Sequence, residues 1–78
     1  MASKSVTWWK IHRNSPGMDR ASKWALLDVL EAEDARLSTV REGLSGDMLV
    51  EWDAMFSSED AERRRIIDEI GETLKTSA

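Results

Sequence analysis

His12 is the only histidine of the chain and the residue best suited to acid–base or metal chemistry. The chain contains no cysteine, which excludes a thiolate nucleophile and a thiolate metal site. One histidine without cysteine is too small a ligand set for a zinc or copper site. A Ser/His/acid triad would have to use His12, which lies in a short N-terminal arm. We therefore expect no enzymatic activity, no metal and no cofactor.

Arg63, Arg64 and Arg65 form the only basic run outside the arm, and such a run could contact nucleic-acid phosphates. Glu59 and Asp60 stand four residues before Arg63 and Arg64, a favourable spacing for ion pairs on a helix surface. The run is therefore more typical of a solvated helix face than of a phosphate site. Phosphate-binding loops and calcium-binding loops are not found in the sequence.

The charge distribution divides the chain into a basic front and an acidic body. Residues 1–23 carry five basic residues and one acidic residue, whereas residues 24–78 carry six basic and fourteen acidic residues. We expect the basic arm to fold onto the acidic body, with an external acidic partner as the alternative. At 78 residues the chain forms one domain at most, and its apolar runs are far shorter than the ~20 residues of a membrane span.

The body, residues 16–78, reads as a small all-α domain, either a helical hairpin or three helices. A long helix is predicted at about 16–43, because Ser15 and Pro16 suit a helix start and an amphipathic leucine stripe follows. Gly43, Ser45 and Gly46 predict its end and a tight turn. A short helix is predicted at about 47–56 and another at about 58–74, with a break at Ser57–Ser58. The last two could instead form one kinked helix.

The arm, residues 1–15, is predicted to be extended or irregular, since Val6, Thr7, Trp8, Trp9 and Ile11 favour strands. Adjacent side chains of an extended segment alternate faces, so Trp8 and Trp9 cannot enter one core together. At least one of them therefore needs a second surface, provided by the body, another copy of the chain or a different partner.

Trp24 and Leu27 lie off the leucine stripe of the long helix and form a second apolar patch. We expect Trp8 or Trp9 to cover this patch, in the same chain or a sister chain. The alternative is an exposed anchor for another protein, because tryptophan and arginine dominate binding hot spots. The predicted partner-binding residues, which unite the arm and this patch, are Trp8, Trp9, Lys10, Arg13, Trp24 and Leu27.

Two charged residues fall at the centres of predicted apolar stripes: Glu33 on the long helix and Arg63 on the last one. If the chain folds back near Ser45, these residues come within about one turn of each other. We expect a structural ion pair between them, across the helix pair or across an oligomer seam, that sets register more than stability.

These features favour a small non-enzymatic protein-binding regulator, such as an inhibitor, an adaptor or a phage-type accessory protein. Its expected partner is another protein of unknown identity; a homodimer or higher oligomer, a cytoplasmic location and no membrane association are also expected. One alternative is a nucleic-acid-binding regulator that uses the basic arm, a layout that loosely resembles ribbon-helix-helix repressors. The net charge of −4 opposes nucleic-acid binding. The second alternative is a structural or assembly protein.

Overall fold

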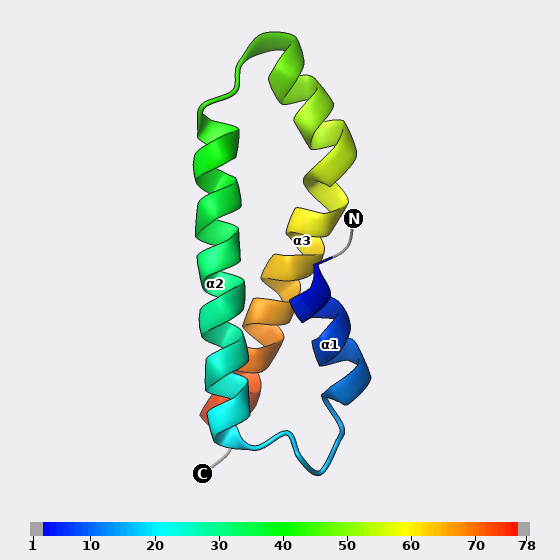
Figure 1. Cartoon of the computed structure of the whole chain (residues 1–78), viewed down its shortest axis with the longest axis vertical. Coiled ribbons are helices and arrows are strands. Elements are labelled where there is room, and N and C mark those ends of the chain that lie inside the picture. Colours follow the sequence, from blue (N-terminus) through cyan, green and yellow to red (C-terminus); the bar gives the residue numbers. More distant parts are fainter. Residues whose placement is uncertain (1–2, 77–78) are drawn as a thin grey trace.

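The computed structural model describes residues 3–76, which form three helices and no strand. Helix α1 spans Lys4–His12, α2 spans Arg20–Glu42 and α3 spans Gly46–Thr76. Helices α2 and α3 form a long antiparallel hairpin, and α1 packs beside the end of the hairpin that lies far from the α2–α3 turn (Figure 1). The all-α prediction is confirmed. None of the helices in the described residues is long and apolar enough to cross a membrane.

The N-terminal arm is helical, so the prediction of an extended or irregular arm is wrong. The Ser3 hydroxyl caps α1 by accepting a hydrogen bond from the Val6 backbone N–H at 3.4 Å. A helix places Val6 and Trp9, three residues apart, on one face, and both are buried. An isolated strand would leave its backbone unpaired, whereas a helix satisfies its backbone internally. Burial of one helix face therefore overrides the strand propensity of these residues.

Helix α2 begins at Arg20, four residues later than the start predicted near Pro16. Asp19 is the actual N-cap, and its carboxylate accepts the Ser22 backbone N–H at 2.8 Å. That hydrogen bond lowers the pKa of Asp19 from its ordinary value of 3.8. Aspartate caps helices as well as serine does. Capping at Asp19 leaves residues 13–19 free to turn the chain from α1 into α2.

The predicted break at Ser57–Ser58 is absent, and α3 is one helix from Gly46 to Thr76. Both serines are exposed, and a serine in a helix interior costs only a few tenths of a kcal/mol. Packing along α2 is enough to offset that cost. The predicted turn is confirmed: Gly46 has a φ of 58°, a left-handed conformation that favours glycine.

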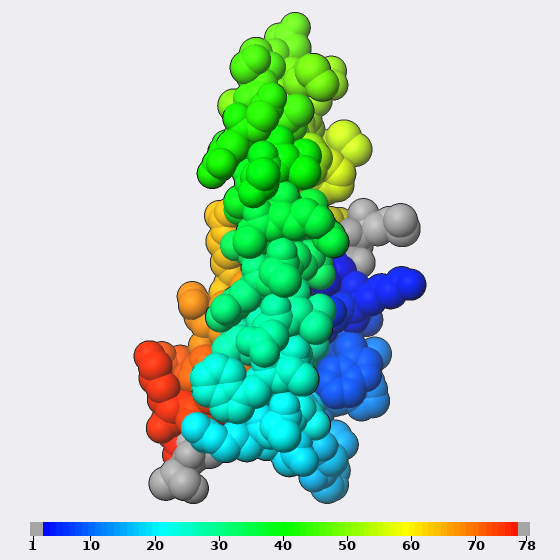
Figure 2. Space-filling model, turned by 60° about the vertical axis from the view of Figure 1, so that its left-hand side comes forward, coloured from blue at the N-terminus to red at the C-terminus, as the bar shows by residue number. Residues whose placement is uncertain are grey.

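The hairpin has two unlike halves. The proximal half, residues 3–30 and 63–76, contains α1 and every buried residue that the structure describes. Its core contains Val6, Trp9, Leu26, Leu27, Leu30, Ile66, Ile70 and Leu74. The distal half, residues 31–62, is a two-helix extension in which no residue is buried. The molecule measures 46 × 19 × 16 Å and narrows beyond α1 toward the turn (Figure 2).

Candidate functional site

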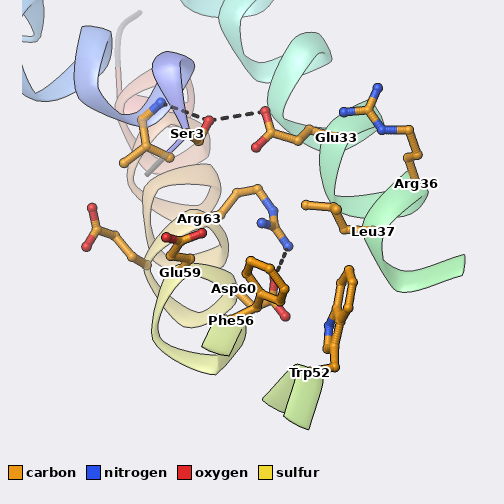
Figure 3. A pocket seen from close by; sticks show the side chains of 11 residues that line it. Ser3, Glu33, Arg36, Leu37, Trp52, Phe56, Glu59, Asp60 and Arg63 are labelled. Carbon is orange, nitrogen blue, oxygen red and sulfur yellow. Dashed lines mark hydrogen bonds and ion pairs between the residues drawn. The ribbon is translucent and has the colours of Figure 1, made fainter. Parts of the chain in front are cut away.

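A groove of about 440 Å³ opens where the N-terminus of α1 meets the distal half of the hairpin. Ser3 and Val6 of α1 line its near end, and side chains of α2 and α3 line its two walls (Figure 3). The full set of lining residues combines α1, α2 and α3: Ser3, Val6, Glu33, Arg36, Leu37, Trp52, Phe56, Glu59, Asp60, Glu62 and Arg63. We call this site the distal groove. It continues the path that α1 follows along the hairpin.

The apolar part of the distal groove comes from Leu37, Trp52 and Phe56. Leu37 of α2 faces Trp52 of α3, and the Trp52 and Phe56 rings pack with centroids 4.6 Å apart (Figure 3). All three side chains are only partly buried. A third helix beside them would remove the remaining apolar surface from water, as α1 does for the proximal core.

Arg63 closes the inner end of the groove and is the one buried charged residue of the described chain. Its guanidinium donates to Asp34 of α2 at 2.8 Å and to Asp60 of α3 at 2.7 Å. Burial alone would lower the pKa of Arg63, but the hydrogen bonds to Asp34 and Asp60 raise it. The guanidinium therefore stays charged and satisfied, and it fixes how α2 and α3 lie against each other.

The predicted Glu33–Arg63 ion pair is wrong in its acidic partner. Glu33 lies at the groove wall and accepts a hydrogen bond from the Ser3 hydroxyl at 3.1 Å. Asp34, the next residue along α2, takes the place predicted for Glu33. A one-residue change rotates a side chain by about 100° around a helix, which the approximate alignment of two predicted helices could not resolve.

The basic arm folds onto the acidic body, as the charge distribution predicts. Lys10 pairs with Glu62, and Arg13 donates to Glu69 at 3.1 Å; both acidic residues belong to α3. The hydrogen bond from Lys10 lowers the pKa of Glu62 from its ordinary value of 4.5. Helix α1 is thus a basic helix that inserts an apolar anchor, Trp9, into the core and pairs at its edge with acidic residues of α3.

The two arm tryptophans separate, one inward and one outward, but on a helix and not on the extended arm from which the prediction was argued. Trp9 is 1% exposed within the core, whereas Trp8 is 43% exposed and packs on His12 with ring centroids 4.6 Å apart. Trp9 is therefore removed from the set of partner-binding candidates. Lys10 and Arg13 already serve an internal contact, which leaves Trp8 as the accessible aromatic residue of the arm.

The predicted Trp24–Leu27 patch is also divided by the fold. Leu27 is buried in the core, so the prediction that it contacts a partner is wrong. Trp24 remains 47% exposed, so α1 does not fully cover it. Leu27 lies close enough to the leucine stripe for the core to absorb it, and Trp24 lies farther around the helix.

The distal half carries the features that the sequence reading missed. Val40, Met48, Val50 and Met55 are all exposed by 45% or more. Trp52 and Phe56, four residues apart, share one face of α3, and both stay partly exposed because no third helix covers that face. The sequence does contain a sign of this surface: residues 48–56 form an apolar helix face, and the sequence predicts no further element that could cover it.

The same half concentrates the negative charge. Residues 31–62 contain ten acidic and two basic residues, a net charge of −8, and the rest of the chain carries +4. One of the two basic residues, Arg41, forms a bidentate ion pair with Asp53 at 2.8 and 2.9 Å. This pair joins α2 to α3 near the turn and lowers the pKa of Asp53. The distal surface is therefore apolar in its groove and strongly acidic around it.

The described residues include no group of three or more histidine or acidic side chains that could hold a metal ion. Comparisons of the chain with models of protein families, with curated proteins and with solved structures find no match. The functional argument therefore depends on the geometry of the distal half.

Proposed function

We propose that this protein is a small non-enzymatic regulator or adaptor that binds another protein through the distal half of its hairpin. The observation that carries the proposal is the unequal burial of the two halves. In the proximal half α1 covers the α2–α3 groove, whereas in the distal half the groove remains open and its apolar flanks are exposed. Exposed apolar surface rimmed by polar residues is typical of protein-interaction sites.

The distal half also has the composition of a binding hot spot. Trp52 and Phe56 supply large aromatic surface, and Met48 and Met55 supply flexible apolar side chains near them. The acidic surroundings would speed the encounter with a basic partner and discriminate against acidic ones. A cytoplasmic location accords with the absence of cysteine and belongs to the same proposal.

The nucleic-acid alternative has weaker support. Lys10 and Arg13, the basic residues on which it depended, pair with Glu62 and Glu69. The distal half, at −8, would repel phosphates.

The test is an affinity capture from the native host with three immobilised baits. The first is the unchanged protein, and the second is Met48→Lys/Met55→Lys, which places two charges on the distal surface. The third is Ile11→Lys/Val29→Lys, a matched control with the same added charge on exposed apolar residues of the proximal half. Circular dichroism and thermal unfolding verify that both variants fold, as expected for substitutions at exposed helix positions.

We expect a partner that the unchanged protein and the proximal control retain and the distal variant loses. Equal retention by all three baits would place the contact elsewhere and overturn the distal assignment. Failure of the unchanged bait to retain any protein above a blank resin would overturn the regulator proposal itself.

A further inference from the structure

We infer that the occupant of the distal groove is a basic amphipathic helix of the partner protein, which lies end to end with α1 and completes the three-helix packing. This inference rests on the proposed function and specifies the chemistry of the partner. Three observations carry it: the continuity of the groove with the α1 site, the side-chain faces along the groove and the charge around it.

The distal groove begins at the first turn of α1. Ser3, the N-cap of α1, and Val6 both line the groove, and the Ser3 hydroxyl donates to Glu33 on its wall. Helix α1 therefore packs along one part of the α2–α3 pair, and these two helices continue past its N-terminus (Figure 1). We call the face of the pair on which α1 packs the track. On α3 the lining residues run from Trp52 to Arg63, about 16 Å of this track at ~1.5 Å per residue, which is the length of about three helical turns.

The track is apolar beyond α1. At about 100° per residue, Val40 lies about 60° from Leu37 on α2, in the same direction as Glu33, which reaches Ser3 of α1. On α3, Met55 lies about 60° from Trp52, in the same direction as Glu62, which reaches Lys10 of α1. Val40 and Met55 are 45% and 68% exposed. The apolar strip that α1 covers in the proximal half thus continues uncovered.

Helix α1 shows which chemistry this track accepts. It has no acidic residue, it inserts Val6 and Trp9 between α2 and α3, and Lys10 at its edge pairs with Glu62. The distal groove offers a similar combination, since Leu37, Trp52 and Phe56 are apolar and the distal half around them carries a net charge of −8. A helix with a large apolar anchor and flanking lysines or arginines is complementary to it.

A second copy of the chain fits the groove less well. If the distal half of a second copy packed against this groove, its net charge of −8 would lie against the −8 of the first copy. Like charges brought together at an interface repel and weaken the association. The charge therefore favours a basic helix from a different protein over self-association through this face.

The test uses two synthetic helical peptides of about three turns. One combines leucine and alanine with lysine, and the other has the same pattern with glutamate in place of lysine. Each is titrated into the ¹⁵N-labelled full chain, and the four tryptophan indole N–H signals are followed by NMR. The Trp52 signal is assigned from its loss in Trp52→Phe. The same titrations are repeated with Val40→Lys/Met55→Lys and with the proximal control Ile11→Lys/Val29→Lys.

We expect the lysine peptide to shift the Trp52 signal saturably and to bind at least about tenfold more tightly than the glutamate peptide. The distal variant should lose about tenfold or more in affinity, whereas the proximal control, which carries the same added charge, should change by about twofold or less.

Three results would overturn the inference. Equal affinity for both peptides would show that charge does not select the partner helix. A shift confined to the indole signal of Trp8 or Trp24 would place the peptide on the proximal half. Concentration-dependent dimerisation of the free chain, abolished by Val40→Lys/Met55→Lys, would place a second copy in the groove. None of these results contradicts capture of a partner by the distal surface, so failure of the helix inference is distinguishable from failure of the proposed function.

Discussion

The proximal and distal halves are built from the same two helices and differ in whether a third helix covers them. In the proximal half Leu26 and Leu30 of α2 and Ile66 and Ile70 of α3 belong to one buried cluster, to which α1 adds Val6 and Trp9. In the distal half Leu37 of α2 meets Trp52 of α3 without such a cover. Two amphipathic helices bury only part of their apolar faces against each other, and full burial needs a third layer. The position of α1 therefore determines which part of the α2–α3 hairpin is buried as core and which part stays exposed as surface.

The two halves also depend on different interactions. The proximal half is held by apolar burial, whereas the distal half is held by the Asp34–Arg63–Asp60 cluster at its base and the Arg41–Asp53 pair near the turn. The Arg41–Asp53 pair is exposed, and exposed ion pairs contribute little to stability. The distal half should therefore open more readily than the proximal half, a property that suits a surface that accommodates a partner.

The largest expected effect comes from removal of the α1 anchor. Trp9→Ala empties a fully buried site and should lower the free energy of unfolding by about 3–5 kcal/mol. Trp8→Ala, its neighbour with 43% exposure, should cost about 1 kcal/mol or less. Urea unfolding followed by circular dichroism measures both. Equal losses for the two variants would contradict the assignment of Trp9 alone to the core.

A second comparison uses two leucines on the same face of α2, one in each half. Leu30 is 0% exposed, and Leu30→Ala should cost about 2–5 kcal/mol. Leu37 is partly exposed in the groove, and Leu37→Ala should cost about 1 kcal/mol. The same urea unfolding measurement applies. If Leu37→Ala proves as costly as Leu30→Ala, the distal half is as well packed as the proximal half and the contrast fails.

The smallest expected effect concerns pH and the ion pairs of each half. The pKa values of Glu62 and Asp53 are lowered by hydrogen bonds from Lys10 and Arg41. A lowered carboxyl pKa contributes stability that is complete above the ordinary values, 4.5 and 3.8, and is lost as pH falls through the lower folded values. Thermal unfolding between about pH 5 and pH 2 should therefore be less pH-dependent in Lys10→Gln and in Arg41→Gln than in the unchanged protein.

The two substitutions should differ in how strongly they change the pH dependence of the unfolding midpoint, because one lies in each half of the hairpin. Lys10→Gln acts on the contact between α1 and α3, which breaks only when the proximal half unfolds. Arg41→Gln acts near the turn, where local opening precedes global unfolding, so its effect on the midpoint should be the smaller of the two. A larger effect of Arg41→Gln would show that the turn unfolds together with the core.

Periodicity predicted most of the fold because the apolar stripes on α2 and α3 are regular. Ile66, Ile70 and Leu74 share one face of α3, and all three are buried. Leu26, Leu30, Leu37 and Val40 share one face of α2, but only Leu26 and Leu30 are buried. The helix boundaries were less predictable. Aspartate and serine are similarly favoured as N-caps, so Asp19 and Ser15 compete as the start of α2, and Ser57–Ser58 resembles a cap unless the partner helix is known to run past it.

The candidate site was less accessible to sequence reasoning than the fold. The arm residues and Trp24 drew attention because tryptophan and basic residues are conspicuous, yet Trp9 and Leu27 belong to the core. The distal groove combines residues from three helices. Its existence depends on where α1 stops relative to the hairpin, and that position does not follow from local propensity.

The sequence by itself determined the helical class, the hairpin turn at Gly46 and the attraction of the basic arm to the acidic body. These features depend on local backbone preferences, side-chain periodicity and net charge, which act over a few residues or do not require exact geometry. Only the tertiary structure decided that the arm is a helix, that Arg63 pairs with Asp34 and Asp60, and that the distal groove stays open. Each of these outcomes depends on which surfaces meet across the hairpin, because burial against a distant segment outweighs the small local preferences of the residues involved.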